Sequence, residues 1–172
     1  MMAMIRVLLF RLSTSNKAAA AAEMALVMPF LIILMFGSFE LGNYFLNEHV
    51  VAKAVRDGAR YAARRSFTDF SCPNTVASDV VDKTRNVTRT GQVANGGVAR
   101  LPNWTAATTV TVTLNCTTIT GGNYSGIYKG MANVPTIKVS AIVPYRSLFN
   151  NLGFTSSTLN LVSESEATVQ GI

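Results

Sequence analysis

The sequence predicts an α+β fold, in which one long N-terminal helix precedes a small antiparallel β-sheet domain. Three patterns lead to this prediction: an uncharged apolar run near the N-terminus, a helical repeat of small aliphatic residues after it, and an alternation of apolar and polar residues further on. The 172 residues are 49% hydrophobic and only 14% charged, and the hydrophobic excess lies mostly between Ala18 and Leu46. This uneven composition is typical of a membrane segment joined to an ordinary polar domain.

The apolar run from Met24 to Phe39 carries no charge over its 16 residues. As a helix it spans about 24 Å, and the alanines from Ala18 to Ala22 supply the rest of a hydrocarbon core of about 30 Å. Backbone amides in lipid must be satisfied within the segment, so we expect a membrane helix over residues 19–46. Pro29 removes one hydrogen bond of this helix and predicts a kink.

Residues 1–18 form a basic leader with Arg6, Arg11 and Lys17. Small residues follow the apolar region in a secretory signal peptide, whereas here they precede it, so a cut among them would leave the apolar segment as an anchor. Five basic residues on the far flank slightly favour the opposite orientation. Because the leader is compact and holds no acid, we expect a cytoplasmic N-terminus and a periplasmic C-terminal domain.

Residues 47–66 are predicted to continue the helix as an amphipathic extension. One face carries basic residues and another carries small aliphatic ones. The basic set is Lys53, Arg56, Arg60 and Arg64, and the aliphatic set is Val51, Val55, Ala59 and Ala62. Gly58 weakens the helix by up to about 1 kcal/mol. A solvated or lipid-facing basic stripe is the favoured interpretation, and binding of nucleic acid through it is the less favoured one.

Residues 67–172 are rich in Thr, Ser, Asn and Gly and are predicted to form a β-containing domain. A short helix is expected over Asp79–Thr88 and a loop from Asn86 to Pro102, with a turn at Gly121 and Gly122. Alternation predicts three strands, with Val110, Val112, Leu114 and Cys116 on one face of the first, a second over Thr136–Val143 and a third over Thr158–Gln170. Pro144 is expected to end the second strand or to place it at an edge.

The two cysteines, Cys72 and Cys116, both follow the membrane segment. An even pair outside the cytoplasm suggests one disulfide, and two unpaired buried thiols are the alternative. Two cysteines are too few for a zinc site, so no metal and no cofactor are expected. The only histidine, His49, lacks a nearby nucleophile, and no nucleophile motif or phosphate-binding loop is present, so an enzyme is not expected.

The stretch KAAAAAEMALVMPFLIILMFGSFELGNYF, followed by RDGARYAA, resembles the TadE-like pseudopilins of the tight-adherence (Flp-type) pilus systems of bacteria. The resemblance implies that a prepilin peptidase cuts between Ala18 and Ala19, with Glu23 at the fifth mature position. It also assigns Glu23 and Pro29 to processing recognition and assembly. The chain departs from the family at Ala18, where glycine is more usual. Glu40 is either a residue of subunit pairing or a solvated interfacial acid.

The resemblance implies a pilin-like minor subunit that is required to assemble a pilus used in adhesion and biofilm formation. Its implied partners are other pilin or pseudopilin subunits, the peptidase, an inner-membrane assembly platform and membrane lipid. Its implied location is the bacterial inner membrane as a single-pass protein, or the pilus on the cell surface. The alternative is a signal-anchored envelope protein that binds a ligand and joins no filament.

Overall fold

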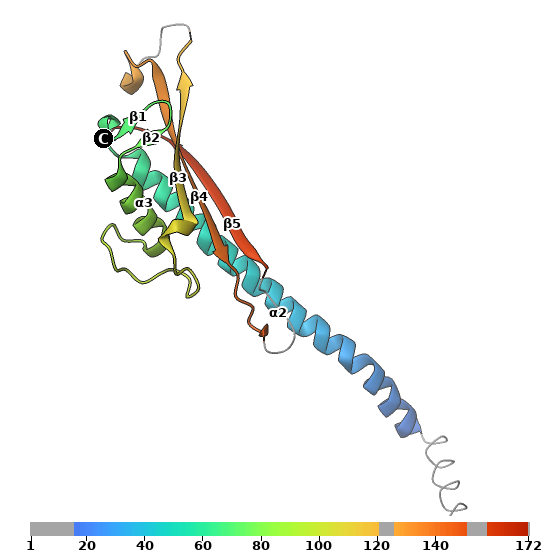
Figure 1. Cartoon of the computed structure of the whole chain (residues 1–172). Helices are drawn as coiled ribbons and strands as arrows, with labels where there is room; N and C mark the ends of the chain where they lie inside the picture. Colours follow the sequence, from blue (N-terminus) through green and yellow to red (C-terminus); the bar gives the residue numbers. More distant parts are fainter. Residues whose placement is uncertain (1–15, 121–125, 151–157, 172) are drawn as a thin grey trace, which may run out of the picture. The chain divides into compact units, whose positions relative to one another are not determined.

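The computed structural model describes residues 16–120, 126–150 and 158–171 of the chain (Figure 1). It confirms the α+β class: a long apolar N-terminal helix is followed by antiparallel sheets. The chain divides into two compact units, residues 1–42 and 43–172, and the long helix α2 (Asn16–Ala63) contributes to both. The predicted extension 47–66 and the predicted domain from residue 67 fall in the second unit, and α2 ends at Ala63, three residues before the expected end.

In the second unit, three strands form an antiparallel sheet in the order β3-β4-β5. They are β3 (Val110–Thr118), β4 (Asn133–Pro144) and β5 (Asn160–Thr168). The expected alternation is present, since every second residue of β4 from Pro135 to Val143 is buried. Of the two alternatives for Pro144, the first is confirmed, because this residue is the last of β4. The second does not apply, since β4 is the central strand.

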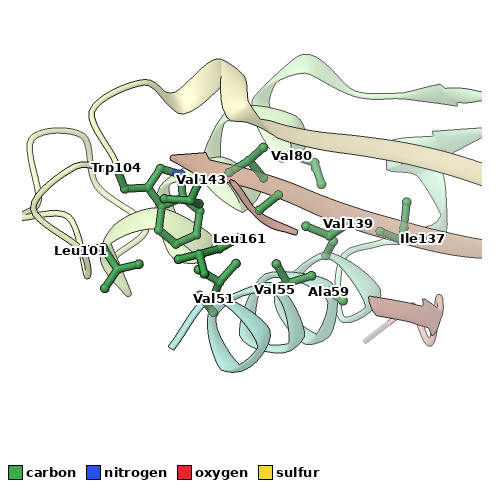
Figure 2. Close-up of a cluster of buried hydrophobic side chains, with 14 of the residues drawn as sticks. Val51, Val55, Ala59, Val80, Leu101, Trp104, Ile137, Val139, Val143 and Leu161 are labelled. Carbon is green, nitrogen blue, oxygen red and sulfur yellow. The ribbon is translucent and has the colours of Figure 1, made fainter. Parts of the chain in front are cut away.

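The core of this unit lies between one face of α2 and the inner face of the sheet. Figure 2 shows Val51, Val55 and Ala59 of α2 together with side chains of the sheet. The predicted aliphatic stripe of α2 is therefore the buried one, and Val51 and Val55 have no exposed surface. The sheet and the segment before it contribute Leu101, Trp104, Val110, Leu114, Ile137, Val139, Ala141, Val143 and Leu161.

A second helix, α3 (Ser78–Thr90), also packs in this unit. The predicted loop from Asn86 is wrong for its first five residues, because α3 continues to Thr90 and ends at Gly91, which has a φ of 77°. Burial accounts for the longer helix: Val80, Thr84 and Thr88 recur every four residues and are all buried. Tertiary packing thus overrides the weak helix propensity of Asn and Thr.

A small two-stranded sheet that the sequence analysis did not predict pairs β1 (Phe70–Ser71) with β2 (Thr75–Val76). Single 3-10 turns lie at Phe67–Asp69, Ala107–Thr109 and Gly126–Tyr128. The predicted turn at Gly121 and Gly122 lies outside the described residues.

Candidate membrane and assembly segment

The helical part of the first unit exposes its apolar side chains on all sides. Leu26, Phe30 and Leu34 are 72%, 69% and 66% exposed, and none of the most apolar 18-residue window is buried. Among the described residues, this is the one helix long and apolar enough to cross a membrane. A helix that is apolar all round is stable when lipid or other helices surround it. The geometry therefore fits a single membrane anchor.

Glu23 is exposed on this helix, directly after the exposed alanines Ala19 to Ala22. Ala18 also lies within α2, which begins at Asn16. Four residues separate Ala19 from Glu23, so the two positions share a face about 6 Å apart along the axis. A charge at the backbone nitrogen of residue 19 would therefore lie within about one helical turn of the Glu23 carboxylate of the same chain.

Pro29 lies inside α2, six residues after Glu23. Further along, the Ser38 hydroxyl donates to the Leu34 carbonyl at 2.7 Å, and Glu40 is half-buried. Glu23 and Glu40 are 17 residues apart, or about 26 Å along the helix, so the two acids mark separate levels. The structure does not bring them together into one site.

In the second unit, the basic stripe of Lys53, Arg56, Arg60 and Arg64 is exposed, as the periodicity predicts. None of these four side chains forms an ion pair with a described residue. Most other basic residues of the unit do: the pairs are Arg65–Asp69, Lys83–Asp79, Arg85–Asp82, Arg100–Asp57 and Lys138 with Glu164 and Glu166. Uncompensated positive charge is thus concentrated on one face of α2.

Asp57 interrupts the basic stripe of α2 and bonds to Arg100. The Arg100 guanidinium donates to the Asp57 carboxylate at 2.9 Å, and both side chains are partly buried. This ion pair links α2 to the loop that follows α3, and no periodicity in the sequence predicts it. The signal available in the sequence was a single acid placed among four basic residues, with a lone arginine in a glycine-rich loop.

Three of the shallow hollows on the described surface of the second unit lie beside α2. One of about 350 Å³ is lined by polar and apolar groups in similar measure, among them Asn43, Asn47, Arg146 and Leu161. The other two flank the basic stripe at Arg60 and Arg64. Pockets for small ligands are mostly apolar and enclosed, whereas these hollows are open to solvent and only about half apolar. Among the described residues, no cluster of three His, Cys, Asp or Glu side chains could hold a metal ion.

Cys72 and Cys116 form a disulfide, with their Cα atoms 5.9 Å apart. The bond joins the short turn between β1 and β2 to the edge strand β3. His49 is exposed on α2, and the aromatic residues Trp104 and Tyr145 are buried. The disulfide and the two aromatic residues therefore belong to the packed part of the second unit.

Comparison with known families bears on the first unit and the start of the second. The model of the family described as TadE-like protein matches residues 18–60, a quarter of the chain. The match begins at Ala18 and includes Glu23, Pro29 and Glu40. No curated protein and no solved structure matches the chain. Residues 18–60 are therefore a TadE-like segment, and the resemblance seen in the sequence is confirmed.

Proposed function

We propose that this chain is a pseudopilin whose leader is removed by a prepilin peptidase and whose helix then takes part in assembly of a tight-adherence pilus. In this proposal residues 1–18 are a cytoplasmic leader, 19–46 cross the inner membrane, 47–66 extend the helix, and 67–172 form a domain outside the cytoplasm. The observation that carries the proposal is the TadE-like match beginning at Ala18, on a helix whose most apolar 18-residue window has no buried residue.

The chemistry of Glu23 explains why processing would matter for assembly. A cut between Ala18 and Ala19 creates a free amine, which is positively charged at neutral pH. In a bundle of such helices this ammonium pairs with the Glu23 carboxylate of a neighbour, in a region of low dielectric constant. Removing one partner of a buried pair costs about 3–5 kcal/mol, so the pair fixes the axial register of adjacent helices. The uncleaved chain has no such amine.

Pro29 and Glu40 take secondary roles in this proposal. Pro29 leaves the carbonyl of Ala25 without its helical hydrogen bond, which marks a point where the helix bends or accepts a partner group. Glu40 lies near the end of the apolar run and is a candidate for pairing with another subunit. The partners are other pilin or pseudopilin subunits, the peptidase, an inner-membrane platform and lipid.

Mass spectrometry of the protein purified from membranes tests the proposal. We expect a mature N-terminus at Ala19. A bulky residue at the cut, Ala18→Trp, should leave the leader attached and abolish pilus formation, whereas the matched substitution Ala22→Leu should be processed normally. An intact leader on the wild-type chain, in cells that form pili normally, would overturn the proposal.

The alternative is a single-pass envelope protein that binds a ligand and joins no filament. The hollow of about 350 Å³ beside Asn43, Asn47 and Arg146 is the observation in its favour. In that case the leader remains attached as an uncleaved signal anchor. Deletion of the gene would then leave pili unchanged, and Arg146→Ala would impair ligand binding without affecting the N-terminus.

A further inference from the structure

We propose that two copies of this chain bind side by side, through the outer face of α2 on one copy and the outer face of the β4–β5 sheet on the next. The α2 outer face is defined here as the exposed residues Phe45, Leu46, His49, Lys53, Arg56, Arg60 and Arg64. The sheet outer face is defined as Lys138, Ile142, Val162, Glu164 and Glu166. The inference rests on the proposed function only in that both copies stand in one membrane.

The α2 outer face has an apolar part and a basic part. Phe45 and Leu46 are 50% and 69% exposed, although both are large hydrophobic residues. The four residues of the basic stripe follow on the same side of the helix, and none is ion-paired with a described residue. A partner for this face therefore needs an apolar patch followed by negative charge.

The sheet outer face has the complementary composition. Ile142 and Val162 are direct neighbours across β4 and β5, and they are 52% and 60% exposed. Glu164 and Glu166 follow on β5, with Lys138 between them at 2.8 and 3.7 Å. Two carboxylates against one ammonium leave one net negative charge, and both carboxylates remain largely exposed to solvent.

On both faces the apolar part and the charged part follow one another in the same direction along the molecule. The Asn43 end of α2 lies beside the start of β5, because Asn43 donates to the Tyr145 hydroxyl at 2.9 Å and the Tyr145 amide donates to the Leu159 carbonyl. At the other end the Gln170 amide donates to the Ala63 carbonyl at 2.7 Å. β5 therefore runs in the direction of α2, as Figure 1 also shows. On each face the apolar part comes first and the charged part second.

The distances along the axis between the apolar and the charged residues are also similar on the two faces. With a helical rise of 1.5 Å per residue, Lys53 and Arg56 lie about 10 and 15 Å beyond Leu46. With a strand rise of about 3.3 Å, Glu164 and Glu166 lie about 7 and 13 Å beyond Val162. Two copies in the same orientation thus place Leu46 near Val162 while Lys53 and Arg56 face the two carboxylates.

Each of the two faces finds its complement on another copy of this chain, whereas a lipid surface or a nucleic acid complements one face only. Anionic lipid or nucleic acid would satisfy the basic stripe but offers no complement to the net negative sheet outer face, which lies on another side of the molecule. Contact between two different faces of identical chains is heterologous, and it can repeat from copy to copy to give a ring or a filament. The second unit therefore carries a self-association surface of its own, which begins at Phe45 and Leu46, the last two residues of the proposed membrane segment, and continues along the helix beyond it.

Photo-cross-linking of the full-length chain in membranes tests this surface. With p-benzoylphenylalanine at Val162, we expect a covalent dimer whose linked peptide comes from the α2 outer face of the other copy. A link from Val162 to Val162, to lipid or to another protein would overturn the proposal, as would the absence of any dimer.

Charge reversal gives a second readout. Lys53→Glu together with Arg56→Glu should reduce the cross-linked dimer at least tenfold. Adding Glu164→Lys, Glu166→Lys and Lys138→Glu to the same chain should restore it, since both faces are then reversed. The control Lys129→Glu with Arg146→Glu alters two exposed basic residues outside the stripe and should leave the dimer unchanged. If the five substitutions together do not restore the dimer, although the Cys72–Cys116 disulfide has formed in every variant, the proposal is wrong.

The same samples separate this inference from the proposed function. The mass of the uncross-linked chain reports removal of the leader, and the cross-link reports the surface. A mature N-terminus without the cross-link overturns only the proposed self-association surface. A cross-link on a chain that keeps its leader overturns only the proposed removal of the leader.

Discussion

Gly58 on α2 lies directly against Thr88 on α3. A methyl group at position 58 would overlap the Thr88 hydroxyl, and that hydroxyl is itself buried and donates to the Thr84 carbonyl at 2.8 Å. The two helices therefore meet at a point where one side chain is missing. Sequence reasoning treated Gly58 as a weak point of the helix, whereas the structure shows that the glycine makes room for a neighbouring helix.

Gly58→Ala should destabilise the second unit even though alanine is the better helix former. Alanine gains about 1 kcal/mol in helix propensity, but forcing a methyl group into a close-packed contact costs about 1–3 kcal/mol. We expect a lower unfolding temperature by circular dichroism of the full chain. Thr88→Ala should relieve the overlap, so the double variant should lose less stability than the sum of the two single variants. Additive losses would contradict the contact.

Reduction of the Cys72–Cys116 disulfide should lower the stability of the second unit. The two cysteines are 44 residues apart, and a loop of that length corresponds to about 4 kcal/mol in the chain-entropy model. We expect the midpoint of urea unfolding to fall in reducing buffer. The variant Cys72→Ser with Cys116→Ser should unfold at the reduced midpoint in either buffer, and a wild-type midpoint insensitive to reductant would contradict the prediction.

Glu23→Gln should impair assembly more than membrane insertion. Loss of one partner from a buried ion pair costs about 3–5 kcal/mol, which corresponds to a decrease of about two to four orders of magnitude in association. The measurement is the yield of pili relative to the amount of membrane-bound chain. Glu40→Gln, at a separate level of the helix, provides the comparison. Normal cleavage and normal pili with Glu23→Gln would remove the assigned role.

Stability should decrease in strongly alkaline solution. The hydrogen bond that Lys138 donates to Glu164, aided by the nearby Glu166 charge, raises the pKa of Lys138. Burial likewise raises the pKa of Tyr128, whose hydroxyl donates to the Val169 carbonyl at 2.7 Å. A raised pKa in the folded state stabilises the protein fully below the unfolded values, about 10.4 for Lys and 10 for Tyr. The stabilisation is then lost as pH rises through the folded values.

Melting temperatures between pH 8 and pH 11.5 measure this alkaline loss. Lys138→Met should be less stable than wild type near pH 8 and should show a smaller decrease on going to high pH. Lys129→Met removes an exposed lysine outside the Lys138 cluster and should keep the wild-type profile. An unchanged profile for Lys138→Met would show that the pair with Glu164 contributes nothing to folding.

Patterns with a clear period predicted most of the fold. Alternation identified all three strands of the main sheet, and Ile137, Val139, Ala141 and Val143 are buried as expected. The aliphatic stripe through Val51 and Val55 identified the buried side of α2. These predictions succeeded because an element that buries one face repeats its apolar residues at the period of its own backbone.

Features that depend on contacts distant in sequence could not be predicted. The β1–β2 pair has two residues per strand, too few to show alternation, and it is held by a disulfide to a strand 44 residues away. The ion pair of Asp57 and Arg100 and the contact of Gly58 with Thr88 join segments whose positions depend on the whole fold. For the assembly segment, the resemblance identified Ala18 and Glu23, while the sheet outer face is recognisable only once β4 and β5 are paired.

The core that joins Val55 of α2 to Leu161 of β5 has a consequence for synthesis. More than one hundred residues separate these two side chains, and at about 5–20 residues per second the strand emerges roughly 5–20 seconds after the helix. During that interval the sheet that covers the aliphatic stripe of α2 is incomplete. Early insertion of the apolar segment into a bilayer would hold each nascent chain apart from the others until its last strand arrives, and this would limit aggregation on the ribosome.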